Sequence, residues 1–205
     1  MDCGFPVRIS SGYGGTKKIA KDWAMKKKET VQVAKRVENL LAPFCTCGGL
    51  VLHGISHLRR VAILSGRLAN AVGEDVESAV VMGFLHDCAR RNDKNDIDHA
   101  RDSEVLARGL IERFYSHLDV DRICEAIAGH ADGEVTSDPF TGCLWDADRL
   151  ELKRIGRTID LDLLSTKVAK RLARRRQQGV NLKEQAPQVR EPEGLFLVPR
   201  PGEGV

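Results

Sequence analysis

The chain has 205 residues, of which 42% are hydrophobic, 30% are charged and 5% are aromatic. A chain of this length and apolar content can bury roughly 70% of its unfolded surface in one ordinary domain, which excludes a disordered protein. The net charge of +3, from 32 basic and 29 acidic residues, argues against a nucleic-acid binder. No apolar run nears the ~20 residues of a membrane span, and no secretory signal is visible, so we expect a cytoplasmic protein without a membrane segment.

The first segment, residues 1–51, is predicted to be a basic helical arm. Apolar residues recur at helical spacing between Lys17 and Leu41, and a proline and a pair of glycines follow. The lysines at 26–28 are interpreted as a solvated helix face rather than as a binding patch.

The central segment, residues 52–173, is predicted to form a helical body. Apolar residues recur every three or four positions, and the alternation typical of β-strands is not seen. One helix is expected to begin near Ser56 and to end at Gly73, and Asp75 is expected to cap the next. Three further helical stretches carry the stripes Val105–Phe114, Ile123–His130 and Leu144–Ile155. The sequence therefore predicts an all-α fold.

Residues 174–205 are predicted to be a flexible tail, because they are rich in Arg, Gln, Pro, Gly and Glu. The first residues of this tail continue a basic run that begins at Lys167. Such a run could contact a nucleic acid or an acidic partner, but a solvated helix end is the favoured interpretation.

The six cysteines are predicted to be reduced thiols, because two of them fall on helix faces predicted to be buried and nothing indicates export. Cys45 and Cys47 have a spacing that can hold a soft metal. A second pair at zinc-finger distance is lacking, so an ordinary loop is favoured for these residues.

His57 and His86 are predicted to lie at the same level of two neighbouring helices. His57 precedes Gly73 by 16 residues, and His86 follows it by 13 residues. If the chain turns at Gly73, a rise of 1.5 Å per residue carries the two histidines roughly 24 Å and 20 Å from the turn. Asp87 adds a carboxylate beside His86, and imidazole with carboxylate is the ligand mix expected for Mn, Fe, Ni, Co or Zn.

Asp146 and Asp148 offer a further anionic ligand, because both lie in apolar company in a helical stretch. A buried carboxylate without a cation is costly, so a metal ion or an arginine should lie close. From these residues alone, a salt bridge to Arg149 or Arg154 explains the acids as well as metal binding does.

Three sequence strings together resemble the H…HD…D signature of the HD-domain superfamily of metal-dependent phosphohydrolases. They are HGISHLRRV at 53–61, FLHD at 84–87 and DADRL at 146–150. The intervening RND at 91–93, DHA at 98–100 and GCLW at 142–145 resemble a little-characterised bacterial subset of the superfamily. The resemblance covers residues 52 to 168, and it implies a helical bundle with a metal site.

Carried over by position, the resemblance implies four metal ligands: His57, His86, Asp87 and Asp146. His57 is preferred to His53 because the family ligand stands three residues before an Arg-Val pair, and a polar contact is favoured for His53. The implied cofactor is a divalent ion (Mn, Fe, Ni, Co, Mg or Zn), bound singly or as two ions.

The implied reaction is hydrolysis of a phosphoester of a nucleotide or a similar small phosphorylated compound, by attack of a metal-bound water. Asp87 is expected to orient that water, and His99 or His130 is expected to act as general acid or to join the metal site. Arg91 and Arg149 are predicted to bind the phosphate of the substrate.

Other interpretations stay open at this point. The HD fold could serve as a non-catalytic sensor or scaffold that binds a metal or ligand, although a partly open metal site favours an enzyme. Some relatives of the fold use two irons for oxidation. The basic residues at 26–28 and 174–176 leave nucleic-acid binding as a third alternative, and a homo-oligomer is also open.

Overall fold

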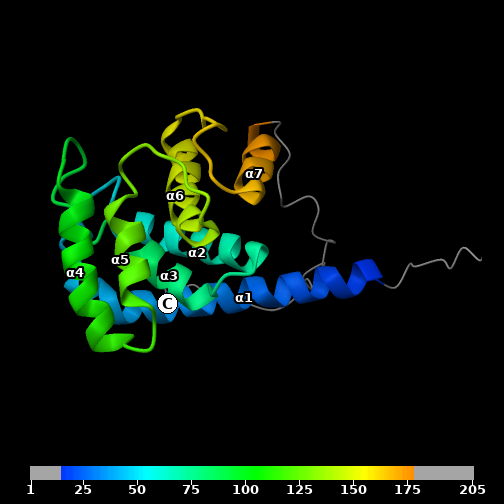
Figure 1. Ribbon diagram of the computed structural model, residues 1–205, viewed down its shortest axis with the longest axis horizontal. Coiled ribbons are helices and arrows are strands. Elements are labelled where there is room, and N and C mark those ends of the chain that lie inside the picture. Colours follow the sequence, from blue (N-terminus) through cyan, green and yellow to red (C-terminus); the bar gives the residue numbers. More distant parts are fainter. Residues whose placement is uncertain (1–14, 178–205) are drawn as a thin grey trace, which may run out of the picture.

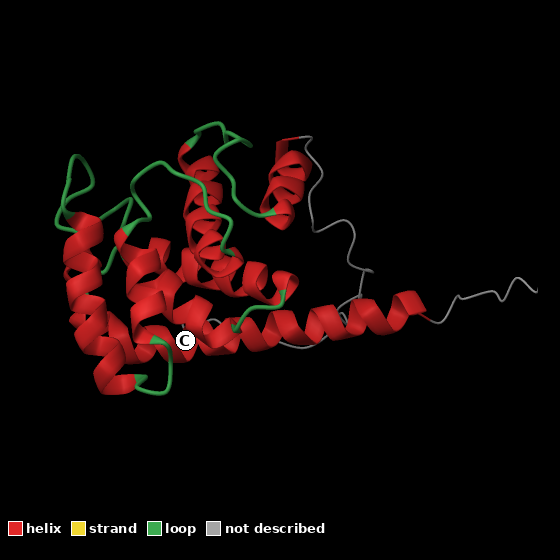
Figure 2. Cartoon of the chain, in the orientation of Figure 1, coloured by secondary structure: helices red, strands yellow, loops and turns green. Residues whose placement is uncertain are grey.

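The computed structural model describes the backbone of residues 15–177 and the side chains of residues 28–177. Within these residues the chain is helical and contains no β-strand, which confirms the predicted all-α fold (Figures 1 and 2). The helices are α1 (Gly15–Leu41), α2 (Ile55–Val72), α3 (Val76–Leu85), α4 (His99–Phe114), α5 (Val120–Ala128), α6 (Pro139–Glu151) and α7 (Lys167–Gln177). Short 3₁₀ turns occupy Ala42–Phe44, Thr46–Gly49 and Leu152–Ile155.

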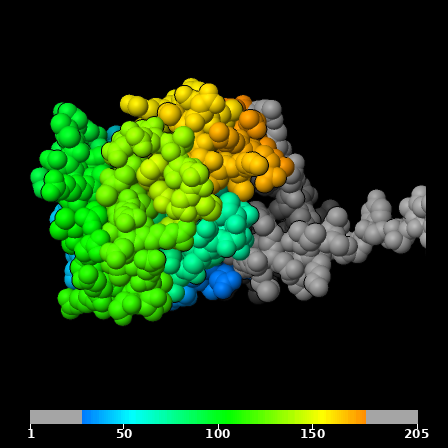
Figure 3. All heavy atoms as spheres, in the orientation of Figure 1, coloured from blue at the N-terminus to red at the C-terminus, as the bar shows by residue number. Residues whose placement is uncertain are grey.

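Helix α3 forms the centre of the bundle. Its residues from Ser78 to Leu85 are all buried, as expected of a helix that is apolar on every side. Helix α2 packs against α3 and α6, α4 packs against α5, and the long α1 lies along α2 and α3 (Figure 1). In the space-filling view, α4 to α7 make up most of one face, and a small part of α1 shows in blue at its lower edge (Figure 3).

The turn between α2 and α3 forms where the sequence predicts it. Gly73 ends α2 in the left-handed region, with φ of 89°, and its N–H donates to the carbonyl of Ala69. Asp75 caps α3 by accepting a 2.7 Å hydrogen bond from the N–H of Ser78. The prediction for Ser56 is wrong, because α2 begins at Ile55 and Gly54 occupies the N-cap position.

Helices α2 and α3 approach closely at Gly83. A Cβ atom at this position would lie 2.9 Å from the Cα of Ala62 and 3.1 Å from its backbone nitrogen. Backbone atoms cannot give way as a flexible side chain can, so the approach depends on glycine. Because Gly83 lies one turn before His86, this contact also sets how near His86 comes to α2.

The C-terminal part of the described chain belongs to the bundle. Helix α7 packs against α2 and α6, and it buries Ala169 and Ala173. The predicted boundary at residue 173 falls inside this helix, which continues to Gln177. The predicted tail beyond Gln177 and the first 14 residues lie outside the described residues. Among those described, no helix combines the length and the apolar character needed to cross a membrane.

Replacing Gly83 by Ala should lower the free energy of unfolding by about 1–3 kcal/mol, because the added methyl group overpacks the α2–α3 contact. Gly109 is the matched control, since it lies in α4 and a Cβ atom there meets nothing within 4 Å. Gly109→Ala should raise stability by about 0.5–1 kcal/mol through helix propensity. Denaturant unfolding measures both, and a Gly83→Ala variant as stable as Gly109→Ala would contradict the close approach.

Candidate metal centre

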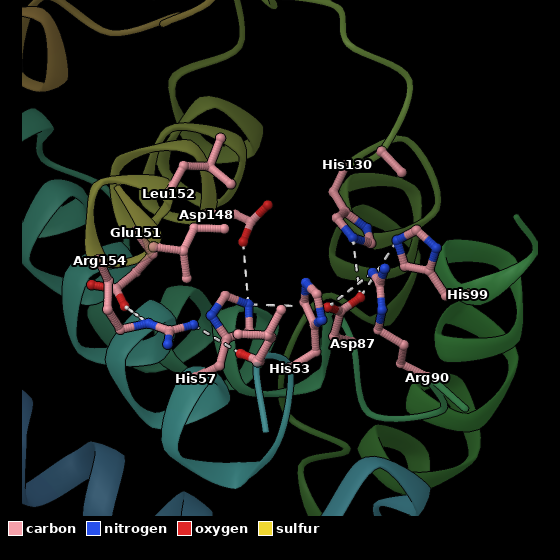
Figure 4. Close-up of a pocket in the computed structure, with 13 residues that line it drawn as sticks. His53, His57, Asp87, Arg90, His99, His130, Asp148, Glu151, Leu152 and Arg154 are labelled. Atoms are coloured by element: carbon pink, nitrogen blue, oxygen red, sulfur yellow. Dashed lines mark hydrogen bonds and ion pairs between the residues drawn. The ribbon is translucent and has the colours of Figure 1, made fainter. Parts of the chain in front are cut away.

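Five of the chain's six histidines gather at one end of the bundle, around Asp87 and Asp148. They come from separate elements, as Figure 4 shows for most of them. His57 lies in the first turn of α2, His86 follows α3, His99 begins α4 and His130 follows α5, while His53 precedes α2.

The first group of ligand atoms lies between α2, the end of α3 and α6. The Nε2 atoms of His57 and His86 are 3.2 Å apart. Asp148 Oδ1 lies 3.2 Å from the His57 nitrogen and 3.6 Å from the His86 nitrogen. Asp87 Oδ2 lies 4.0 Å and 3.8 Å from the same two nitrogens.

The second group uses the other carboxylate oxygen of Asp87. Its Oδ1 atom lies 3.4 Å from His130 Nε2 and 3.5 Å from His99 Nε2. Asp87 therefore stands between two sets of imidazole nitrogens, with one oxygen facing each set.

Backbone hydrogen bonds fix the orientation of three of these rings. The Nδ1 atoms of His86, His99 and His130 lie against the backbone carbonyls of Gly83, Asp96 and Ile127. A carbonyl only accepts, so each Nδ1 carries the proton, and a neutral ring then presents the lone pair of Nε2 to the centre. Metal-binding histidines are commonly held in this way, with the remote ring nitrogen donating to a carbonyl.

Buried groups at the centre lack partners that a cation would supply. The side chain of Asp87 is 2% exposed, and its Oδ1 atom has no hydrogen bond among the described residues. A buried carboxylate facing nitrogen lone pairs is costly unless a positive charge lies between them. The donor set of imidazole and carboxylate fits a divalent ion of the Mn, Fe, Co, Ni or Zn type.

The pKa shifts of the clustered groups also indicate a place for a cation. Burial alone would lower the pKa of His86, but Asp87 and Asp148 outweigh burial and raise it to about 9. Burial alone would likewise raise the pKa of both carboxyl groups, and the facing histidines instead hold each well below its usual range. The cluster therefore stabilises positive charge at its centre, and a metal would replace the proton on His86.

The structure corrects the predicted role of Asp146. Its Oδ1 atom accepts a hydrogen bond from the N–H of Ser165, and its Oδ2 atom accepts from the N–H and the hydroxyl of Thr166, at 2.6–2.7 Å. Both oxygens are thus engaged with the segment that leads into α7, and Asp148 takes the place at the cluster. Residues two apart on a helix point about 200° from each other, so only one of the two acids can face the histidines.

The predicted phosphate contacts of Arg91 and Arg149 are not found at the pocket. Arg91 forms an ion pair with Asp102 and its side chain is 68% exposed. Arg149 donates to the backbone carbonyls of Glu134 and Leu163 and lies over the ring of Trp145. Their guanidinium groups are occupied elsewhere.

The cluster lies at the base of a pocket with a volume of about 100 Å³. Arg90 lines one side, with its Nη1 atom 3.4 Å from Asp87 Oδ2, and Arg154 lines another. Both arginines were passed over by the sequence-based choice of phosphate ligands, although Arg90 lies only three residues after Asp87. The helical offset of three, which returns a side chain to the same face, was the signal available for Arg90.

His53 makes the polar contact expected of it and also lines the pocket. Its Nδ1 atom lies 3.1 Å from Asp93 Oδ1. The same carboxylate accepts hydrogen bonds of 2.9–3.1 Å from the N–H groups of Val51, Leu52 and His53. Burial opposes ionisation of Asp93, but these N–H groups and the His53 side chain together outweigh it and lower the pKa to about 2.

The fold and this cluster agree with the comparison against known families. The HD domain family matches residues 54–175, more than half of the chain, and the chain belongs to this family. The family is, in general, one of metal-dependent phosphohydrolases. Among curated proteins and among solved structures, none matches the chain.

Exchanging the two acids of α6 for amides should separate their roles. Asp148→Asn should lower metal affinity at least about tenfold, with little loss of stability in the metal-free protein. Asp146→Asn should instead lower the free energy of unfolding by about 1.5–3 kcal/mol, because the hydrogen bonds to Ser165 and Thr166 lose their charge. Mass spectrometry measures the metal content of each variant, and thermal unfolding measures its stability. A loss of metal in Asp146→Asn but not in Asp148→Asn would restore Asp146 as a ligand.

The contribution of Asp93 to stability should depend on pH. Its pKa of about 2 lies below the value near 4 of an unfolded chain, so its stabilising effect is complete above about pH 4 and disappears as the pH falls toward 2. Wild type should therefore exceed Asp93→Asn in unfolding free energy at pH 7, and the difference should shrink between pH 4 and pH 2. Denaturant titrations of the metal-free proteins measure this, and a difference that is constant with pH would count against it.

Proposed function

We propose that the protein is a metal-dependent phosphohydrolase that cleaves a phosphoester of a nucleotide or a similar small phosphorylated compound. The observation that carries the proposal is the position of Asp87, whose two buried oxygens face two sets of histidine nitrogens at the base of an open pocket. A helical bundle that binds no cation gains nothing from such an arrangement, because it buries carboxylates beside imidazole nitrogens at a cost in free energy.

The distances support two neighbouring cation positions that share Asp87. One is formed by His57, His86 and Asp148, and the other by His99 and His130. His86 is near both, but its Nδ1 donates to Gly83, so its single free nitrogen serves one position. In this arrangement His99 and His130 hold the second ion rather than act as general acids.

When bound, divalent ions at these positions would polarise a phosphoryl oxygen and lower the pKa of water. The residues of the chain supply the rest of the site. Asp87 and Asp148 hold the centre negative enough to retain cations, while the guanidinium of Arg90 lies beside Asp87, where it can receive an oxygen of the phosphate. The pocket is large enough to admit a phosphate group and is open to solvent.

The alternative from the sequence, a sensor or scaffold without catalysis, shares the metal centre and differs only in turnover. A cytoplasmic location, a small phosphorylated partner and a homo-oligomer stay predictions.

Phosphate release tests the proposal directly. The protein loaded with Mn, Fe or Co should release phosphate from at least one of a set of nucleotides and sugar phosphates, and a chelator should abolish the release. Replacing both His99 and His130 by Ala should lower kcat at least about 100-fold, because the proposed second cation position then keeps only Asp87 Oδ1 as a ligand.

His117→Ala is the control for this experiment. His117 is 62% exposed, pairs with Glu77 and does not line the pocket, so its loss should leave kcat unchanged. A protein that binds metal and releases no phosphate from any compound of the set would favour the sensor.

A further inference from the structure

One wall of the pocket carries an arginine that the metal centre does not use. Arg154 lies in the 3₁₀ turn Leu152–Ile155 and is 34% exposed along its side chain. It lines the pocket on a different side from Arg90, and in Figure 4 His53 and His57 lie between the two arginines. The two cationic side chains thus lie on either side of this part of the metal centre.

Arg154 shares its nearest carboxylate with a second arginine. Glu151 is the acid nearest to it, but that carboxylate makes a 2.6 Å contact with Nε of Arg60 and lies 3.7 Å from Arg154. One donor of Arg154 is used by the carbonyl of Leu52, at 2.9 Å. Apart from Nε, which faces Glu151, its other N–H groups have no partner among the described residues, and a guanidinium fork with free N–H groups is suited to carboxylate or phosphate.

Arg154 lines the same pocket as the metal centre, so it lies within reach of a group attached to a phosphate bound there. The lining of this pocket also includes the apolar side chains of Leu52, Leu152 and Ile155. A substrate that extends beyond its phosphate along this wall would contact these apolar side chains and the guanidinium of Arg154.

We propose that Arg154 binds a second anionic group, a phosphate or a carboxylate, carried by the substrate beyond the phosphate that is cleaved. This inference rests on the proposed function, because it assumes that the cleaved phosphate lies at the metal centre. The preferred substrates are then compounds with two anionic groups separated by a short spacer, rather than simple monophosphate esters.

Binding of stable phosphonates to the metal-loaded full chain tests the inference without turnover. Methylphosphonate carries one anionic group, methylenediphosphonate carries two, and phosphonoacetate pairs a phosphonate with a carboxylate. Isothermal titration calorimetry measures the affinities. Arg154→Met should lower the affinity for methylenediphosphonate or phosphonoacetate roughly tenfold or more, as expected for the loss of one charge-assisted contact, and should leave the affinity for methylphosphonate unchanged. Whichever of the two loses more affinity identifies the second group as phosphate or carboxylate.

Arg157→Met is the matched control, because Arg157 is exposed in the same stretch and its side chain has no ion pair or hydrogen bond among the described residues. It removes the same charge and should leave all three affinities unchanged. Arg154→Lys, which keeps the charge without the fork, should recover part of the lost affinity. Metal content is measured for each variant, so that loss of the ions is not mistaken for loss of the contact.

The outcomes separate this inference from the proposed function. Equal loss for all three phosphonates on Arg154→Met, or no loss for any of them, would overturn the role of Arg154 and leave hydrolysis untouched. Failure of every phosphonate to bind the metal-loaded wild type would overturn both the phosphate site and this inference. A wild type that binds them with the expected selectivity and yet hydrolyses nothing would uphold Arg154 and refute the hydrolase.

Discussion

The carboxylate of Asp87 is the constraint around which the rest of the structure is arranged. It is almost completely buried, one of its oxygens has no hydrogen bond from the part of the chain that the structure describes, and four imidazole nitrogens lie within about 4 Å of it. The chain places the Nδ1 protons of three rings on backbone carbonyls, so those protons are not available to Asp87. A cation bound at the proposed centre would offset the electrostatic cost of burying this carboxylate, and through it metal binding would be coupled to folding.

Several contacts remote from the chemistry hold the ligands to this geometry. Gly83 lets α3 approach α2, so that His86 reaches His57. Asp146 ties α6 to the segment before α7, which fixes the helix that carries Asp148. Asp93 gathers three N–H groups of the loop before α2 and orients His53. The carboxylates of Asp93 and Asp146 are satisfied by hydrogen bonds within the protein, whereas Asp87 Oδ1 has none among the described residues. This contrast distinguishes supporting residues from a site that can receive a ligand.

The sequence predicts the fold and much of the centre because both follow from helical periodicity. Counting residues from Gly73 is enough to bring His57 and His86 together, since the two helices are antiparallel neighbours of known rise. The choice between Asp146 and Asp148 could not be made in this way. Both acids lie among apolar residues, and the face that each occupies depends on where Ser165 and Thr166 return to α6, which is a tertiary contact without a local signal.

The choice of arginines predicted to bind phosphate also depends on tertiary contacts that the sequence does not reveal. Arg91 and Arg149 adjoin the motifs in sequence, but Asp102 and the carbonyls of Glu134 and Leu163 engage them away from the pocket. Arg154 lies four residues after the DADRL string and reaches the pocket because the 3₁₀ turn after α6 folds toward Leu52.

The proposed metal ligands and Arg154 therefore lie in different kinds of structural element. The ligands are fixed by packed helices, which hold a geometry precisely, whereas Arg154 and Leu52 belong to connecting segments, where sequence can change at little cost to the core. Under the proposed function, such a division would let the same metal centre act on different phosphorylated compounds, with the choice made by the residues of these connecting segments.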